Sequence, residues 1–341
     1  PNTAPINASN PCSEYVFLDN SACNLSSLNL MKFLKENGKF DVEAFLKAVR
    51  IMIIAQEIIV DNSSYPTPEI KKISHEYRTL GLGYANLGAL LMATGLPYDS
   101  ERANSLAAVI TALMTGQAYR TSAELAARMG PFEGFEKNRI STMRVIHKHR
   151  EALSEIDSAM VPMDLLHAAM EVWDEAIMEG SRHGYRNAQV TLLAPTGTIA
   201  FMMDCDTTGI EPEFSLIKVK KLVGGGTLRI VNHTIPRALE NLGYQKDEIR
   251  DILKHVEVKE TIEGAPRFQE EHLAVFDCAD RVAGATRSIE ALGHIKMCGA
   301  VQPFLSGAIS KTINLPNEAT VEEIKEAYIQ GWKFGMKSVS I

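Results

Sequence analysis

Apolar residues recur at helical spacing through the first half of the chain. Between residues 41 and 60 they return every three or four positions, which is typical of a helix with one buried face. Asp41 stands where an N-cap is expected, and prolines at 66 and 68 end the pattern. The apolar positions of this stretch are Phe45, Val49, Met52 and Ile53. The same reasoning predicts helices over 82–94, 101–129, 136–153 and 163–180.

The second half alternates strand-like and helical stretches. Residues 188–193 predict a strand, 195–198 a turn, and a helix is expected to start near Thr198. The strand, helix and strand expected between 309 and 341 form a βαβ unit, so parallel pairing is predicted there. The remaining predictions are strands near 211–221 and 336–341, a flexible loop at 224–226, a strand and short polar helices over 227–275, and helices over 286–301 and 320–333.

A cluster of glycines at Gly81, Gly83 and Gly88 invites comparison with dinucleotide-binding loops. The G-x-G-x-x-G spacing is not met, and no clear strand precedes the cluster. Tight packing of a helix is the interpretation that we favour.

Composition supports a large globular α/β chain. The 341 residues are 45% hydrophobic and 23% charged, with a net charge of −7. Lys218, Lys220 and Lys221 form only a short basic cluster, which argues against a nucleic-acid site. The five cysteines include no C-x-x-C pair, which favours a reducing cytoplasm, and we find no signal peptide or membrane-spanning run. Both ends look cut.

Metal sites are not expected. His147 and His149 point apart on a helix and should be solvated, and His294 and Cys298 have no further pair to complete a tetrahedral set. Two acids flank Cys205, so its thiol pKa should be raised and its role structural.

A thiol lies between a carboxamide and a carboxylate at Asn10, Cys12 and Glu14. In an extended segment, positions i, i+2 and i+4 share one face. These three side chains could therefore reach one small substrate together.

A second candidate site follows the strand expected at 188–193. A strand, a glycine-containing turn and a helix N-terminus present free backbone N–H groups, and the helix dipole favours negative charge. Thr196 and Thr198 can add hydroxyl donors. Taken alone, the pattern also fits a capped helix after a strand.

The motifs together resemble a known family. Residues 7–30, NASNPCSEYVFLDNSACNLSSLNL, look like the finger-loop region of adenosylcobalamin-dependent (class II) ribonucleotide reductases. Residues 186–199, with their A-P-T-G-T-I ending, resemble the loop that holds the substrate phosphates in that family, and 302–316 resemble a late barrel strand. The resemblance implies a fragment of the ten-stranded α/β barrel with a central finger loop. Within one domain, 1–341, it implies a finger loop at 7–30, a helical region at 41–180 and a phosphate-loop and half-barrel region at 185–341.

The resemblance also implies a role for each residue. Cys12 would carry a thiyl radical, Glu14 would act as general base, and Asn10 would orient the ribose. Cys23 and a thiol upstream of Pro1 would supply two electrons as a redox pair. The implied substrate-binding residues are Asn10, Pro11, Cys12, Ser13, Glu14, Pro195, Thr196, Gly197, Thr198 and Ile199.

Adenosylcobalamin is the implied radical source. Pro11 and the PTGT loop follow the class II pattern, and the tandem tyrosines of diiron-dependent (class I) enzymes are missing, since Tyr328 is the only tyrosine after Tyr244. A class I catalytic subunit and a non-catalytic phosphate-ligand module are the alternatives.

The partners implied are a ribonucleoside di- or triphosphate, a thioredoxin-like reductant and the missing N-terminal part of the barrel, and a homodimer is an assembly that the resemblance allows. The fragment alone should be inactive, because half a barrel leaves unpaired strand edges.

Overall fold

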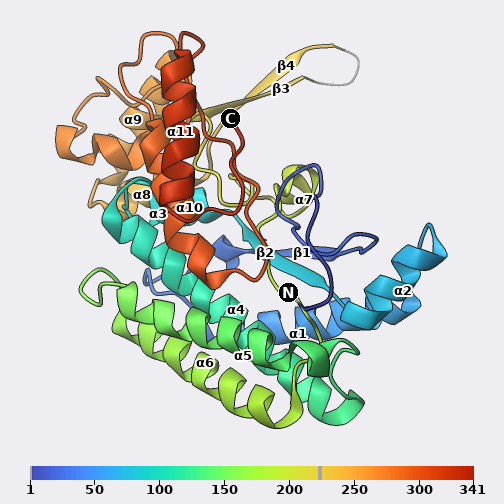
Figure 1. Ribbon diagram of the computed structural model, residues 1–341. Coiled ribbons are helices and arrows are strands. Elements are labelled where there is room, and N and C mark those ends of the chain that lie inside the picture. The colour runs from blue at the N-terminus through green and yellow to red at the C-terminus, as the bar shows by residue number, and fades with distance from the viewer. Residues whose placement is uncertain (1, 222–224) are drawn as a thin grey trace.

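The computed structural model describes residues 2–221 and 225–341, and it leaves the side chains of 219–221 and 227–230 undescribed. The predicted loop at 224–226 therefore lies partly outside the described residues. The side chains of the lysines at 220 and 221 lie outside them as well. The fold combines many helices with a few short strands (Figure 1).

Five extended segments, all parallel, form the centre of the molecule. Strand β1 (Asn24–Asn29) pairs with β2 (Leu80–Ala85) from Asn24↔Leu80 to Asn29↔Ala85. Isolated parallel bridges then extend the order across the sheet: Leu82↔Thr191, Leu193↔Ile309 and Thr312↔Ser340. The segments thus lie side by side in chain order. The parallel pairing predicted between 309 and 341 is confirmed.

The helices follow the predicted order, and their bounds are α1 (Val42–Asn62), α2 (Pro68–Tyr77), α3 (Leu87–Ala93), α4 (Glu101–Met129), α5 (Phe135–Ala152), α6 (Met163–His183), α7 (Gly197–Met202), α8 (Thr234–Asn241), α9 (Lys246–Lys259), α10 (Ala291–Val301) and α11 (Val321–Lys333). Short 3-10 turns lie at Leu30–Phe33, Leu153–Glu155, Glu270–Phe276 and Gln302–Phe304. The predicted caps are confirmed. Asp41 accepts the Ala44 N–H at 3.2 Å, and Thr320 forms a capping box with Glu323.

Long helices pack on one side of the strands and form the main core. In Figure 1, α4, α5 and α6 lie together below β1 and β2. The Ala-rich α4 is buried along most of its length, and its closest helical neighbour is α6. Trp173 of α6 and Tyr185 are among the largest fully buried side chains.

A second, smaller core forms around residues 215–280. Its buried side chains include Leu216, Ile235, Leu239 and Ile252, from the segments around β3 (Ile217–Lys221), α8 and α9. The hairpin of β3 and β4 (Thr227–Val231) projects away from the body (Figure 1).

Several sequence-based expectations are wrong in detail. The segment 82–94 is not one helix, because its first residues belong to β2 and only Leu87–Ala93 are helical. The strand expected at 211–221 is shortened to Ile217–Lys221, and the helix expected at 286–301 begins at Ala291. Pairing with β1 sets the bounds of β2, and Glu290 is the N-cap at which α10 begins.

The glycines at 81 and 83 serve strand packing rather than helix packing. A Cβ on Gly81 would lie 2.8 Å from the Cys23 sulfur, and one on Gly83 would lie 2.5 Å from the Leu192 carbonyl oxygen. Glycine is needed at both positions because neighbouring segments of the chain approach the backbone too closely for a side chain.

His149 is not solvated, contrary to the expectation. It is buried, its ring stacks on Trp173, and its Nδ1 lies 2.5 Å from the Pro303 carbonyl oxygen. Burial lowers the pKa of His149 to about 4. The charged residues around His149 in the sequence indicated a solvated helix face. The contact with Pro303 could not be predicted, because that residue lies far along the chain.

None of the helices in the described part of the chain combines the length and apolar character that a membrane span needs.

Candidate functional site

The Asn-Pro-Cys-Ser-Glu stretch forms a tight hairpin. Ser9 and Val16 make an antiparallel bridge. Inside it, the Asn10 carbonyl accepts the Ser13 N–H at 3.0 Å, and the Asn10 side-chain oxygen accepts the Tyr15 N–H at 3.0 Å. Ser13 adopts a left-handed conformation with φ 68°. The Asn10 amide therefore holds the turn that presents the thiol.

The extended segment that we expected here is wrong. Residues 11–13 turn, so Asn10, Cys12 and Glu14 do not line up on one face. Cys12 and Pro11 are exposed at the tip, whereas the Glu14 side chain is 1% exposed. The alternation of side chains in a strand does not apply here, because hydrogen bonds across the hairpin reverse the direction of the chain.

Glu14 and Cys23 come together at the buried end of the hairpin. Burial raises the pKa of the Cys23 thiol, and the nearby Glu14 carboxylate raises it further. The Glu14 Oε2 atom has no hydrogen-bond partner among the described residues. A buried acceptor without a partner is costly in a folded protein, so it marks a position where a ligand group can be received. The absent side chain of Gly81 makes room for the Cys23 sulfur.

The hairpin is joined to the sheet at the segment around Ala308. The Glu14 carbonyl accepts the Ala308 N–H at 2.8 Å, and the Ala308 carbonyl in turn accepts the Leu193 N–H at 3.1 Å. Leu193 lies two residues before Pro195. The hairpin and the 195–199 loop are therefore linked through a single residue of the neighbouring strand.

The helix predicted after Pro195 is confirmed, whereas residues 188–193 form only isolated parallel bridges at Thr191 and Leu193 in place of the predicted strand. Helix α7 begins at Gly197, and Gly197, Thr198 and Ile199 are exposed. Thr196 is buried, adopts a left-handed conformation with φ 54°, and its hydroxyl oxygen accepts the Gly209 N–H at 2.8 Å. Thr196 thus ties the loop to the body, and Thr198 is the threonine of this loop that faces solvent.

A buried network of amides, which the sequence analysis missed, fixes the segment that follows α7. Asn86 donates to the Asn29 side-chain oxygen at 3.0 Å, and its own side-chain oxygen accepts the Thr207 N–H at 3.0 Å. Asn29 donates to the Met203 carbonyl at 3.1 Å. Asn29 is the last residue of β1 and Asn86 directly follows β2, so an asparagine at the end of each strand was the available signal.

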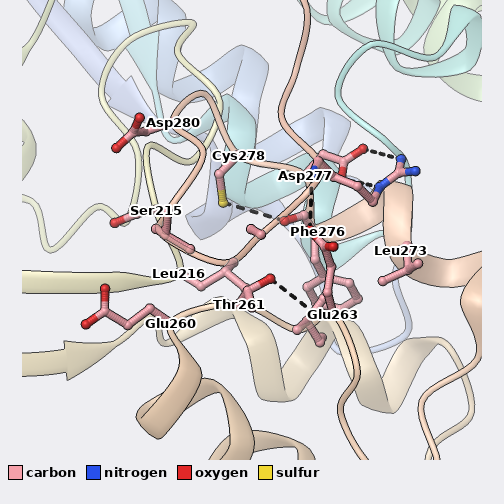
Figure 2. Close-up of a pocket in the computed structure, with 14 residues that line it drawn as sticks. Ser215, Leu216, Glu260, Thr261, Glu263, Leu273, Phe276, Asp277, Cys278 and Asp280 are labelled. Atoms are coloured by element: carbon pink, nitrogen blue, oxygen red, sulfur yellow. Dashed lines mark hydrogen bonds and ion pairs between the residues drawn. The ribbon is translucent and has the colours of Figure 1, made fainter. Parts of the chain in front are cut away.

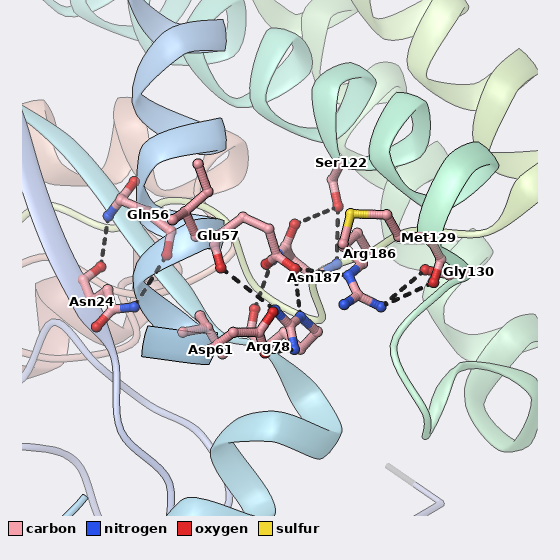
Figure 3. Close-up of polar contacts among 12 residues, drawn as sticks. Asn24, Gln56, Glu57, Asp61, Arg78, Ser122, Met129, Gly130, Arg186 and Asn187 are labelled. Carbon is pink, nitrogen blue, oxygen red and sulfur yellow. Dashed lines mark hydrogen bonds and ion pairs between the residues drawn. The ribbon is translucent and has the colours of Figure 1, made fainter. Parts of the chain in front are cut away.

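Two residues of the run that resembles a phosphate loop belong to a buried ion-pair network instead (Figure 3). They are Arg186 and Asn187. Both contact the carboxylate of Glu57: the Arg186 Nε atom at 2.7 Å and the Asn187 Nδ2 atom at 2.6 Å. Arg78 donates to the same carboxylate at 2.5 Å and makes two bonds of 2.8 Å to Asp61. This network joins α1, the end of α2 and the third strand segment.

The other three cysteines lie after α7, in the second core and in the main core. Burial, with help from Asp206 and Asp204, raises the pKa of Cys205 to about 11, as expected for a structural thiol. Cys278 is buried in the second core, and its sulfur lies 3.5 Å from the Phe276 carbonyl oxygen (Figure 2). Cys298 is buried in the main core on α10. All five cysteines are unpaired.

The family model for the barrel domain of ribonucleotide reductase matches residues 1–341, which is the whole chain. The chain belongs to this family. It is 54% identical over all 341 residues to a vitamin B12-dependent ribonucleotide reductase of Rhodopirellula baltica, of which it covers 33%. It is 49% identical to one of Streptomyces coelicolor, covering 35%. A vitamin B12-dependent ribonucleoside-diphosphate reductase of Mycobacterium tuberculosis is 30% identical, with 42% covered.

The chain thus spans about a third of the length of the first two of these relatives. In the described part of the chain, no group of three or more His, Cys, Asp or Glu side chains is placed to hold a metal ion.

Proposed function

We propose that this chain is the thiyl-radical half of a vitamin B12-dependent ribonucleotide reductase, which converts ribonucleotides to 2′-deoxyribonucleotides for DNA synthesis. One observation carries the proposal. An exposed thiol, Cys12, stands at the tip of a hairpin whose buried end holds Glu14 and Cys23, and the hairpin is joined through Ala308 to the strand before the Pro195 loop.

Each residue has a chemical task in this proposal. Cys12, as a thiyl radical, removes the 3′-hydrogen of the ribose and returns it at the end. Glu14 accepts the proton of the 3′-hydroxyl through its unpartnered oxygen while the 2′-hydroxyl leaves as water. Cys23 and a second thiol, from the part of the protein before this chain, provide two electrons and two protons and become a disulfide.

The remaining predicted residues hold the substrate. The start of α7 is exposed, and its free backbone N–H groups would bind the phosphates together with the Thr198 hydroxyl. Asn10 is committed to the hairpin through Tyr15, so its ligand contact would come from the amide N–H₂. Pro11 and Ser13 complete the turn at the tip. Whether di- or triphosphates are bound depends on how many phosphates the loop accepts.

The residues present fit part of a large corrinoid cofactor. A cavity of about 730 Å³ lies beside α7, and exposed aromatic and polar side chains such as Phe201, Phe214 and Thr312 line it. Mixed lining of this kind suits a ligand with apolar faces and an amide rim. These residues would hold an edge of adenosylcobalamin, which supplies the first radical by homolysis of its cobalt–carbon bond.

We further propose that the five parallel segments are half of a ten-stranded barrel, with the hairpin as its finger loop. The β1 edge and the Ser340 edge each carry backbone groups that a further strand can pair. The preceding part of the protein would cover them, so residues 1–341 alone should be inactive. A thioredoxin-like reductant would restore the two thiols after each turnover. We place the enzyme in the cytoplasm and propose that it forms a homodimer. A phosphate-ligand module without radical chemistry is the competing function.

Electron paramagnetic resonance tests the radical role. In the full-length reductase with adenosylcobalamin, a dithiol and a ribonucleotide, we expect a radical signal whose line width changes when cysteine is deuterated at the β carbon. The hyperfine coupling of the β protons to the sulfur radical is the reason. A signal that ignores this labelling, or no signal from protein that binds nucleotide, would reject the thiyl assignment.

Gly197→Asp tests the phosphate site. A Cβ at this position meets nothing within 4 Å, so the variant should fold, and an acid in the first turn of a helix is favourable. The added charge should weaken binding of a ribonucleoside diphosphate by about tenfold or more, as expected when a like charge faces an anion. Isothermal titration calorimetry measures this effect. Gly197→Ala is the control and should bind within a few-fold of the wild type. Equal affinity in the Asp variant would move the phosphate site elsewhere.

A further inference from the structure

A groove beside α9 combines apolar and cationic side chains. It has a volume of about 570 Å³, and α9 and the segment 231–236 line it. In Figure 1, α9 lies at the edge of the molecule, where it packs on the second core. None of the described residues that line the groove belongs to the hairpin or to the Pro195 loop, so it is separate from the candidate site.

The floor of the groove is apolar. Ile249 is a buried member of the second core, and Val231 and Leu253 are half-buried against that core. Pro236 is also half-buried and lines the groove with them. Apolar surface that stays accessible inside a groove favours a partner that covers it, because water then leaves both surfaces.

Three cations of α9 stand along the same groove. Lys246, Arg250 and Lys254 follow one another at i, i+4 and i+8, so they lie on one face of the helix, about 6 Å apart along its axis. All three are exposed. Lys246 and Lys254 form no ion pair with any residue that the structure describes, and Arg250 lies 3.7 Å from Asp251 of its own helix. Their charges are therefore available to a ligand.

The acids of α9 are engaged in other contacts. Arg267 binds Asp247 at 2.7 Å and Asp251 at 2.5 Å, and it holds the pKa of Asp247 below its usual value. Glu248 accepts a backbone N–H at 2.8 Å within the capping box at the start of the helix. Among the described residues that line the groove, Glu257 is the one acid. This edge of the molecule is thus locally cationic, although the chain carries a net charge of −7.

The combination of floor and cations selects among ligands. A small anion would use the cations alone and leave the floor in water. A nucleic acid needs a longer cationic track than three side chains, and its backbone offers nothing to an apolar floor. An acidic amphipathic helix matches both features. Carboxylates at i, i+4 and i+8 oppose the three cations, while apolar side chains on the adjoining face reach the floor.

We propose that this groove is a docking site for an acidic amphipathic segment of a partner protein. The floor receives the apolar side chains of the segment, and the three cations of α9 pair with its carboxylates. The charge pairs lie on the exposed rim, so they act mainly on the rate of association and on its salt dependence. The proposal does not depend on the radical function, because no residue of the groove takes part in that chemistry.

Fluorescence anisotropy with the full-length reductase tests the proposal. The probe is a fluorescein-labelled, alanine-rich peptide of about 16 residues, long enough to form a helix, with glutamate at every fourth position and leucines on the adjoining face. We expect saturable binding in the micromolar range that weakens as salt is raised. Arg250→Glu should weaken it by about tenfold or more, because a like charge then faces the peptide carboxylates. The Arg250 side chain is 65% exposed, so this substitution should leave the core intact.

Two controls separate the groove from general charge attraction. Lys259→Glu makes the same change of charge at an exposed position of the same helix, but Lys259 does not line the groove. This variant should bind the peptide like the wild type. A peptide with serine in place of each leucine should bind about tenfold less tightly or worse, since it cannot cover the apolar floor.

Absence of binding, or equal affinity of the wild type and Arg250→Glu, would overturn the proposal. Equal weakening by Lys259→Glu, or equal affinity of the serine peptide, would also overturn it, since either result would show charge attraction without the groove. An oligothymidylate that competes as well as the leucine peptide would identify a general polyanion surface in place of a protein-docking site.

Discussion

Replacing Cys12 by Ser should abolish ribonucleotide reduction by the full-length reductase while leaving nucleotide affinity within a few-fold of the wild type. The hydroxyl of serine holds its hydrogen far more strongly than a thiol, so it cannot exchange a hydrogen atom with the ribose. Loss of a residue that forms the reacting bond costs on the order of 10⁴-fold or more. Cys12 is exposed at the tip of the hairpin, so the substitution should not disturb the core. Product formation and calorimetric titration with a ribonucleotide measure the two effects.

Cys278→Ala provides the matched control for this experiment. That thiol is buried in the second core and bonded to the Phe276 carbonyl, so its loss should leave turnover near the wild-type value. Turnover that survives in Cys12→Ser would refute the radical function and favour the phosphate-ligand module. Loss of turnover in both variants would indicate a general sensitivity of the fold to cysteine replacement.

Glu57→Gln should destabilise the protein by about 3–5 kcal/mol, which is the usual cost of removing one partner from a buried ion pair. Glu57 receives Arg78, Arg186 and Asn187 together, and its side chain is 5% exposed (Figure 3). The neutral amide keeps one acceptor oxygen, but it removes the negative charge beside two guanidinium groups and turns an N–H₂ donor toward one of the three donors that Glu57 now receives. Arg78 also adopts a left-handed backbone with φ 50°, and its bonds offset the cost of that conformation. The thermal unfolding midpoint should therefore fall by several degrees.

Glu124→Gln is the control for charge removal at a partly exposed site. Glu124 pairs with Arg50 and Arg120 at a side-chain exposure of 33%. Pairs of this kind contribute less than about 1 kcal/mol, so the midpoint should hardly change. An equal fall in both variants, or no fall in Glu57→Gln, would show that the buried network does not hold the third strand segment to α1 and α2.

Sequence motifs proposed the residues of the candidate site, but they did not predict the backbone conformation around those residues. Residues Asn10 to Glu14, Cys23 and Pro195 to Ile199 were proposed from motifs and stay predictions, and the helix after Pro195 formed as predicted. The geometry within the first motif was wrong. An extended segment would align three side chains, but bonds from Asn10 to Ser13 and Tyr15 produce a turn instead.

What the sequence determined by itself was therefore local: the helical periods, the caps at Asp41 and Thr320, and the parallel pairing between 309 and 341. Only the tertiary structure decided that β2 begins at Leu80, that His149 is buried on Trp173, and that Arg186 and Asn187 contact Glu57. It also decided that Asn29 and Asn86 hold the segment after α7. The physical reason is separation along the chain. Periodicity and capping depend on neighbours within about one or two helical turns, whereas each of these contacts joins residues that only the packing of distant elements brings together.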